Sequence, residues 1–266
     1  MIEKEIDILT KDGAMNTFIT HPEEEGPHPV ILFLMDAPGK RGELHDMARR
    51  LGTAGYYVML PNLYYRRVRK YRIAESSKEE MHEHMDSLSN AMACADVNAL
   101  IKFSDSDDAA RGGKIGCVGY CMSGPFAFAA AASFPDRIAA SASMHGVRLM
   151  TDAQDSPHLD AHKIKGEMYF GCAETDSYAP TGMVEALSAY LAKAEIKARE
   201  SSGIREPNMV SCSRSGRDYT TNLQLSGTGK DSSPCTAAVY NCALPKTQSG
   251  QLHSVQGADF VASRIS

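Results

Sequence analysis

A cysteine at position 121 has the sequence neighbours that a catalytic thiol needs. Residues 114–125 read Lys-Ile-Gly-Cys-Val-Gly-Tyr-Cys-Met-Ser-Gly-Pro, so a β-branched run gives way to small residues around Cys121, and an alanine-rich helical segment follows. This order predicts a tight turn between a strand and a helix, with Cys121 at its tip. N–H groups at the helix N-terminus stabilise the thiolate, the nucleophilic form of cysteine. The alternative is that Cys121 is a buried structural cysteine, as we expect of Cys117 inside the strand.

The predicted turn also indicates where a developing oxyanion would bind. The backbone N–H of Met122, directly after the cysteine, would point at the oxygen of a carbonyl under attack. A second N–H group is expected near Ala37, in the loop after the apolar run 29–35. Together these groups predict acyl transfer to a thiol.

Composition restricts the class of protein. The chain has 266 residues, 43% of them hydrophobic and 23% charged, which suits one large α/β domain. The net charge of -5 argues against nucleic acid or an anionic membrane as partner. We expect neither a secretory leader nor a transmembrane helix, because the required apolar runs are missing. The seven cysteines have no metal-type spacing, so reduced thiols in the cytoplasm are expected.

Hydrophobic periodicity predicts strands that alternate with helices. Alternation on both sides of Asp12-Gly13 predicts an opening hairpin. The expected strands are 5–10, 15–20, 29–35, 56–60, 114–118, 138–144 and 167–170, and the expected helices are 43–54, 76–103 with one interruption, 122–133 and 182–194. This order predicts an α/β protein with a doubly wound, mainly parallel sheet.

The pattern stops near Glu200. Residues 200–266 are rich in Ser, Thr and Gly and show no sustained helical or strand period. A structureless segment of this length is unusual in a compact domain. We therefore predict a domain over residues 5–199, followed by an aberrant, irregular tail without stable fold over 200–266.

Several motifs in the first part of the chain resemble those of the dienelactone hydrolase family. The resemblance covers residues 5–199 in family order. It rests on Pro-Asn-Leu-Tyr (61–64), Val-Gly-Tyr-Cys-Met-Ser-Gly (118–124), Phe-Pro-Asp-Arg (134–137), Met-His-Gly (144–146) and Glu-Thr-Asp-Ser-Tyr-Ala-Pro (174–180). It implies an α/β-hydrolase fold, here incomplete, and an enzyme that hydrolyses a small-molecule ester or lactone without a cofactor or metal.

The resemblance also implies roles for individual residues. Cys121 takes the position of the nucleophile in a Cys–His–Asp triad, and Asp176 takes the position of the acid. Asp36 falls where the family has an acidic residue that contacts the resting thiol. Tyr64 and Tyr65 fall where the wall of the substrate pocket is expected.

The sequence departs from the family pattern at three places. Ser123 replaces the second glycine of the turn, although serine is small enough to allow close packing. No Arg lies between Ser76 and Asn90, where the family holds the dienelactone carboxylate, which argues against dienelactone as the substrate. No Gly-His-x-Phe motif follows Asp176, and His253 is the only later histidine. The catalytic histidine is therefore missing from this chain.

The remaining histidines are weaker candidates. His145 matches a family position that is frequently His but is not catalytic. His82 and His84 lie on an acidic helical segment and are expected to be solvated. His158 and His162 have the spacing of a metal-binding pair on a helix, but no third ligand is evident.

A shifted reading frame would explain the tail. Codons permitted for 200–210 also permit, one base displaced, Val-Glu-Trp-Tyr-Pro-Gly-Thr-Glu-His-Gly, which resembles the family's last strand and catalytic histidine. The same shift permits an amphipathic helix afterwards. We interpret residues from about 200 as translated out of frame, by mutation or sequencing error; the alternative is a genuinely divergent tail.

Two other functions remain open from the sequence. One is an inactive hydrolase-like scaffold that lacks its general base. The other is a thioesterase or another acyl hydrolase on the same fold, which would use the same triad.

Overall fold

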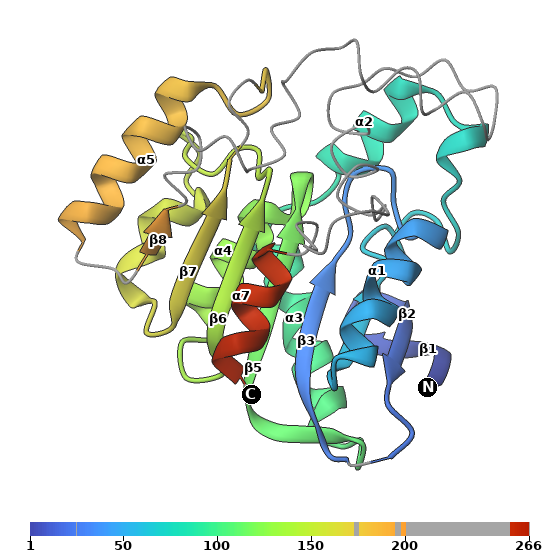
Figure 1. Ribbon diagram of the computed structural model, residues 1–266. Coiled ribbons are helices and arrows are strands. Elements are labelled where there is room, and N and C mark those ends of the chain that lie inside the picture. The colour runs from blue at the N-terminus through green and yellow to red at the C-terminus, as the bar shows by residue number, and fades with distance from the viewer. Residues whose placement is uncertain (25, 173–175, 195–197, 201–255, 266) are drawn as a thin grey trace, which may run out of the picture.

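The structure is a computed structural model that describes residues 1–24, 26–172, 176–194, 198–200 and 256–265. Eight strands of this described part form one sheet in the order β1-β2-β4-β3-β5-β6-β7-β8 (Figure 1). They are β1 (Ile2–Thr10), β2 (Gly13–His21), β3 (His28–Leu34), β4 (Tyr57–Pro61), β5 (Ala110–Tyr120), β6 (Ile138–Met144), β7 (Glu167–Gly171) and β8 (Ala198–Glu200). β1 and β2 form the predicted antiparallel hairpin, and the strands from β4 to β8 are parallel. The predicted doubly wound, mainly parallel sheet is confirmed.

Helices cover both faces of this sheet. They are α1 (Gly42–Thr53), α2 (Lys78–Asp86), α3 (Asn90–Ser104), α4 (Gly124–Ser133), α5 (Thr181–Lys193) and α7 (Gln256–Ile265). Figure 1 shows α1 and α7 on one face and α3 and α4 on the other. The predicted interruption of the segment 76–103 lies between α2 and α3, where the Ser89 hydroxyl accepts the Met92 N–H at 3.2 Å. Within the described residues, no helix is both long and apolar enough to be a membrane span.

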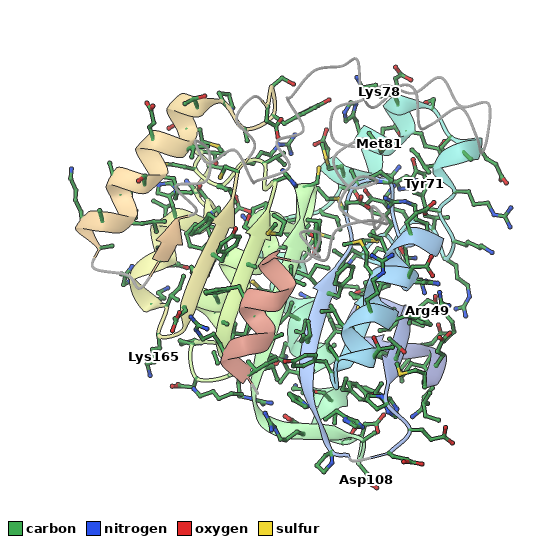
Figure 2. The ribbon with its side chains drawn as sticks, viewed as in Figure 1. Arg49, Tyr71, Lys78, Met81, Asp108 and Lys165 are labelled. Carbon is green, nitrogen blue, oxygen red and sulfur yellow. The ribbon has the colours of Figure 1, made fainter. Side chains whose placement is uncertain are left out.

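The parallel strands point towards one end of the molecule. Figure 2 shows Tyr71, Lys78 and Met81 at that end and Asp108 at the opposite end. Loops that follow parallel strands meet along the same edge of the sheet, which is where ligands bind in open α/β folds. A ligand or substrate site is therefore expected at the carboxyl end of the strands.

The last helix changes one expectation. No regular structure was predicted after residue 200, yet α7 packs on β5 and β6. Val261 and Ile265 are spaced four residues apart, so both fall on one helical face and are buried there. Gly116 leaves the room for this contact, since a Cβ at this glycine would lie 2.0 Å from Val261 Cγ1. The prediction of an irregular tail is therefore wrong for residues 256–265. Residues 201–255 lie outside the described part of the chain.

Candidate active site

Cys121 lies at the turn between β5 and α4. Its φ angle is +53°, in the left-handed region that non-glycine residues rarely adopt. A short 3₁₀ turn, Cys121–Ser123, leads directly into α4. The side chain is buried, with 4% of its surface exposed. This is the strand–turn–helix geometry that the sequence predicts for a nucleophile.

Glycines allow the turn to pack at backbone contact distance. A Cβ added to Gly119 would lie 2.0 Å from the Ser123 carbonyl oxygen. A Cβ added to Gly124 would lie 2.5 Å from both the Cα of Gly146 and the hydroxyl of Ser143. Side chains at Gly119 and Gly124 are therefore incompatible with this turn.

Ser123, which departs from the family pattern, stabilises the turn. Its hydroxyl accepts the Tyr120 N–H at 2.9 Å. The same hydroxyl lies 3.1 Å from the carbonyl oxygens of Leu34 and Tyr120, and it donates to one of them. The side chain thereby connects the end of β3 to the end of β5, which a glycine would not do.

The turn after β6 contacts the Cys121 turn. His145 has a φ of +51° and donates its backbone N–H to Gly171, the last residue of β7, at 2.7 Å. Two residues later, Val147 donates its N–H to the carbonyl oxygen of Cys121 at 3.3 Å. The His145 turn is thus held between the ends of β5 and β7.

Asp176 follows β7, where the sequence predicts the acid. Its Oδ1 accepts the Tyr178 N–H at 2.8 Å, which fixes the carboxylate in a tight turn. Burial holds the pKa of His145 below its ordinary value, while the charge of Asp176 raises it. The Asp176 carboxylate and the His145 ring therefore interact electrostatically.

Asp36 is fully buried beyond the end of β3 and forms an ion pair with Arg41. Arg41 Nη1 lies 2.5 Å from Oδ1 and Nη2 lies 3.0 Å from Oδ2 of Asp36. Burial raises the pKa of the Asp36 carboxyl, and the Arg41 guanidinium opposes that shift. Sequence reasoning identified Asp36 but missed Arg41, because a spacing of five residues in a loop carries no periodic signal.

Tyr64 lies beside both residues that are predicted to bind the oxyanion. Its hydroxyl donates to the carbonyl oxygen of Ala37 at 2.8 Å and lies 3.2 Å from the sulfur of Met122. Burial raises the pKa of Tyr64 well above its ordinary value, and the charges of Asp36 and Cys121 act in the same direction. Tyr64 is thus a neutral phenol within the group of predicted site residues.

The structure does not bring Tyr65 to the same place. The Tyr65 hydroxyl is 2.9 Å from Oδ1 of Asp96 on α3 and 2.7 Å from the hydroxyl of Thr10 on β1. Arg66 completes this second cluster through two bonds to Asp96. Although Tyr65 is next to Tyr64 in sequence, its hydroxyl therefore lies with the hairpin and α3.

The other histidines have structural contacts. His84 was expected to be solvated, but it is buried and its ring stacks on Tyr64 with centroids 5.0 Å apart. His158 bonds the Ser156 hydroxyl at 2.7 Å within a 3₁₀ segment, where a four-residue spacing does not align two ligands on one α-helical face. No group of three or more His, Cys, Asp or Glu suited to a metal ion occurs among the described residues. His253 lies outside the described residues.

Known sequences match most of this chain. A model described as the dienelactone hydrolase family matches residues 15–201. The carboxymethylenebutenolidase of Pseudomonas putida is 24% identical over 184 residues, which are 68% of this chain and 74% of that protein. A protein of Methylorubrum extorquens, provisionally named carboxymethylenebutenolidase, is 27% identical over 135 residues, 51% of this chain. That match spans 46% of the Methylorubrum protein, about half its length.

Solved structures with similar folds include related and distant enzymes. A Klebsiella pneumoniae crystal structure, provisionally titled dienelactone hydrolase, has a TM-score of 0.68 and 20% identity, with 75% of this chain and 83% of that chain covered. The thioesterase domain from the curacin biosynthetic pathway has a TM-score of 0.55 and 11% identity, with 75% of this chain and 92% of that domain covered. At these identities the structures establish the α/β-hydrolase fold alone.

Proposed function

We propose that this chain, which belongs to the dienelactone hydrolase family, hydrolyses small esters or lactones with Cys121 as the nucleophile. The observation that carries the proposal is the left-handed backbone of Cys121 between β5 and α4. A non-glycine residue persists in that conformation only where the surrounding structure compensates for the strain, and such residues cluster at active sites. Gly119 and Gly124 supply the close packing that this compensation requires.

The proposed reaction begins with attack of the Cys121 thiolate on the substrate carbonyl carbon. The backbone N–H groups of Met122 and Ala37 stabilise the oxyanion. Tyr64 supports this arrangement, because its hydroxyl contacts both residues. Asp176 orients an imidazole that moves protons to and from the reacting atoms.

The polar groups around the thiol support a pocket for a neutral carbonyl compound. We place Asp36 beside the thiol, as the family resemblance implies, and its ion pair with Arg41 balances its charge. Tyr64 contributes the pocket wall, and we leave Tyr65 out of it because of its contacts with Thr10 and Asp96. The absence of Arg from residues 76–90 speaks against dienelactone itself. The seven cysteines have no metal-type spacing and suggest reduced thiols, so the cytoplasm remains the predicted location.

Substitution of the nucleophile tests the proposal. We expect Cys121→Ala and Cys121→Ser to lower the turnover of p-nitrophenyl acetate by about 10³-fold or more, to the level of the uncatalysed reaction. Cys94→Ser, on α3, is the matched control and should retain the activity of the parent chain. Unchanged turnover in Cys121→Ala would refute the proposed nucleophile.

An inactive scaffold is the second candidate, because no Gly-His-x-Phe motif follows Asp176. Iodoacetamide distinguishes the two. Selective, pH-dependent alkylation of Cys121 near neutral pH supports a competent thiol. Slow, uniform alkylation of all cysteines supports the inactive scaffold. A comparison of oxygen esters with thioesters then separates an esterase from a thioesterase.

We also propose that residues from about 200 are read out of frame, on the strength of the shifted codons described above. Resequencing the gene around this position tests the idea. A missing or extra base would place a Gly-His-containing segment after Asp176. A confirmed frame would mean that the chain lacks the family histidine, and that any activity depends on another imidazole.

A further inference from the structure

We infer that His145 is the imidazole that serves Cys121 in this chain, with Asp176 as its acidic partner. The inference rests on the proposed function, since it assigns the general base for the same thiol. It differs from the expectation that this histidine is not catalytic. The order of strands, the backbone contacts of the His145 turn and the surroundings of the ring support this role.

The order of strands places His145 between the other two residues. β5, β6 and β7 are neighbours in the parallel sheet, and they end directly before Cys121, His145 and the Asp176 loop, respectively. Because parallel strands end along one edge, the three residues follow one another across that edge. The nucleophile, the imidazole and the acid of a triad need this spatial order.

Backbone contacts hold the His145 turn close to the Cys121 turn. A Cβ on Gly146 would lie 2.1 Å from the Ser143 hydroxyl, and one on Gly124 would lie 2.5 Å from Gly146 Cα. Backbone hydrogen bonds from His145 to Gly171 and from Val147 to Cys121 attach the His145 turn to the end of β7 and to the Cys121 turn. The turn is therefore fixed by contacts that leave no room for a side chain between the two backbones.

The ring has an unused proton-binding atom. Nδ1 of His145 is buried and has no hydrogen-bond partner among the described residues. A buried polar atom without a partner is unfavourable in a folded protein, so its retention calls for an explanation. Burial also keeps the imidazole neutral near pH 7, which is the form that accepts a proton.

His84 is the strongest competing histidine and fits less well. Its ring stacks on Tyr64, and its Nε2 lies 3.8 Å from Glu80 on the same helix. The principal charges that act on it are those of Arg67, Glu80 and Glu83. The charge of Asp176 acts instead on His145.

The proposed reaction consumes one water molecule for each ester or lactone that is hydrolysed. His145 takes the thiol proton while the sulfur of Cys121 forms a bond to the carbonyl carbon. The carbonyl carbon–oxygen single bond then breaks, and His145 returns the proton to the leaving alkoxide, which leaves a thioester on Cys121. A water molecule attacks the thioester, His145 accepts its proton, and the proton passes to the sulfur as the acid is released.

Two substitutions at position 145 test the inference in the full chain. His145→Gly suits the φ of +51° and leaves space in place of the ring. His145→Asn keeps a polar side chain that tolerates this conformation but cannot act as a base. We expect both to lower the kcat for p-nitrophenyl acetate about 100-fold or more, with little change in KM and an unchanged melting temperature. Added imidazole should restore part of the kcat of His145→Gly.

His21→Asn is the matched control. His21 is also buried, and its Nε2 also lacks a hydrogen-bond partner among the described residues, but it lies at the start of the parallel strands beside Tyr57. Its kcat should equal that of the parent chain. Loss of activity in His21→Asn equal to that in His145→Asn would overturn the inference, because a general effect of removing buried rings would explain both.

The remaining outcomes separate the inference from the proposed function. If Cys121→Ala abolishes turnover and His145→Gly does not, His145 is not the base, while the thiol nucleophile stands. If the parent chain acquires an acyl group on Cys121 in a mass spectrum but shows no turnover, the inference is also overturned. If activity survives in Cys121→Ala, both are wrong.

Discussion

The two ends of the parallel strands both contain histidine, tyrosine and aspartate side chains, but they differ in backbone conformation. At the carboxyl end lie Cys121, His145 and Arg148, which are the non-glycine residues with positive φ in the described part of the chain. At the amino end, His21 stacks on Tyr57 with centroids 5.2 Å apart, and the Tyr57 hydroxyl donates to Asp107 at 2.7 Å. The carboxyl end buries Tyr64 and Asp36, whereas the amino end buries Tyr57 and His21 beside the half-buried Asp107. Non-glycine residues with positive φ occur only at the carboxyl end in the described part of the chain, and there the His145 turn contacts the Cys121 turn. These two features distinguish the candidate site.

The largest difference in stability is expected between two variants that each replace one glycine of β5 with alanine, one near each end of the strand. Gly119→Ala would place a Cβ 2.0 Å from the Ser123 oxygen, so we expect a loss of at least about 3 kcal/mol in the free energy of unfolding. Gly112→Ala meets no atom within 4 Å and should change that free energy by less than about 1 kcal/mol. Urea unfolding of both variants measures the difference, and equal losses would refute the close packing at the Cys121 turn.

A smaller difference should follow from neutralising one carboxylate at each end. Asp36→Asn leaves Arg41 without its buried partner, and we expect a loss of about 2–3 kcal/mol in unfolding free energy. Asp107→Asn removes an acceptor whose ion pair with Lys4 is partly exposed and 3.6 Å long, so a loss of about 1 kcal/mol is expected. Thermal or urea denaturation of the two variants makes the comparison. A smaller effect at Asp36 would contradict the predicted order.

Removal of one hydroxyl at each end should separate stability from activity. Tyr64→Phe loses a buried hydrogen bond and Tyr57→Phe a partly buried one, and each substitution should lower the unfolding free energy by about 1 kcal/mol. Only Tyr64 contacts Ala37 and Met122, so only Tyr64→Phe should lower kcat, by about tenfold for one weakened oxyanion group. If both variants lose the same kcat, Tyr64 has no special role beside the thiol.

The smallest expected effect is the loss of folding stability at acidic pH that the buried histidines cause. Burial lowers the pKa of His21 and of His145 in the folded chain, so the unfolded chain binds protons more readily. Their contribution to stability is present above the unfolded pKa of about 6.5 and is lost as the pH falls below it. Urea midpoints at pH 7.5 and 5.5 should therefore differ less for His21→Asn than for the parent chain. An equal or larger difference in the variant would contradict the stated direction.

The sequence predicted the sheet and its helices because both depend on short-range periodicity. The apolar run 29–35 and the alternation around Asp12-Gly13 became β3 and the β1–β2 hairpin. The helix α7 was missed because its pattern is short and lies in a segment of irregular composition. Its helical state is supported by contact with β5, which no local pattern records.

The candidate site was predictable only where a motif reports local geometry. Cys121 was found because small residues and a following helix make a specific turn. Arg41 was missed because its bond to Asp36 lies within a loop, where the spacing carries no periodic signal. His145 was set aside because its partner, Gly171, ends a strand that is distant in sequence. Tyr65 was placed in the pocket through its neighbour Tyr64, although adjacent residues in a turn can point to different clusters. Such contacts become visible only after the strand order is known.

The position of α7 has a consequence for the newly made protein. β5 leaves the ribosome long before Val261 and Ile265, which fill the space over Gly116. At synthesis rates of about 5–20 residues per second, that surface of the sheet stays open for roughly ten seconds during translation. Chaperone demand in the cell should therefore depend on how quickly the end of the chain reaches the sheet.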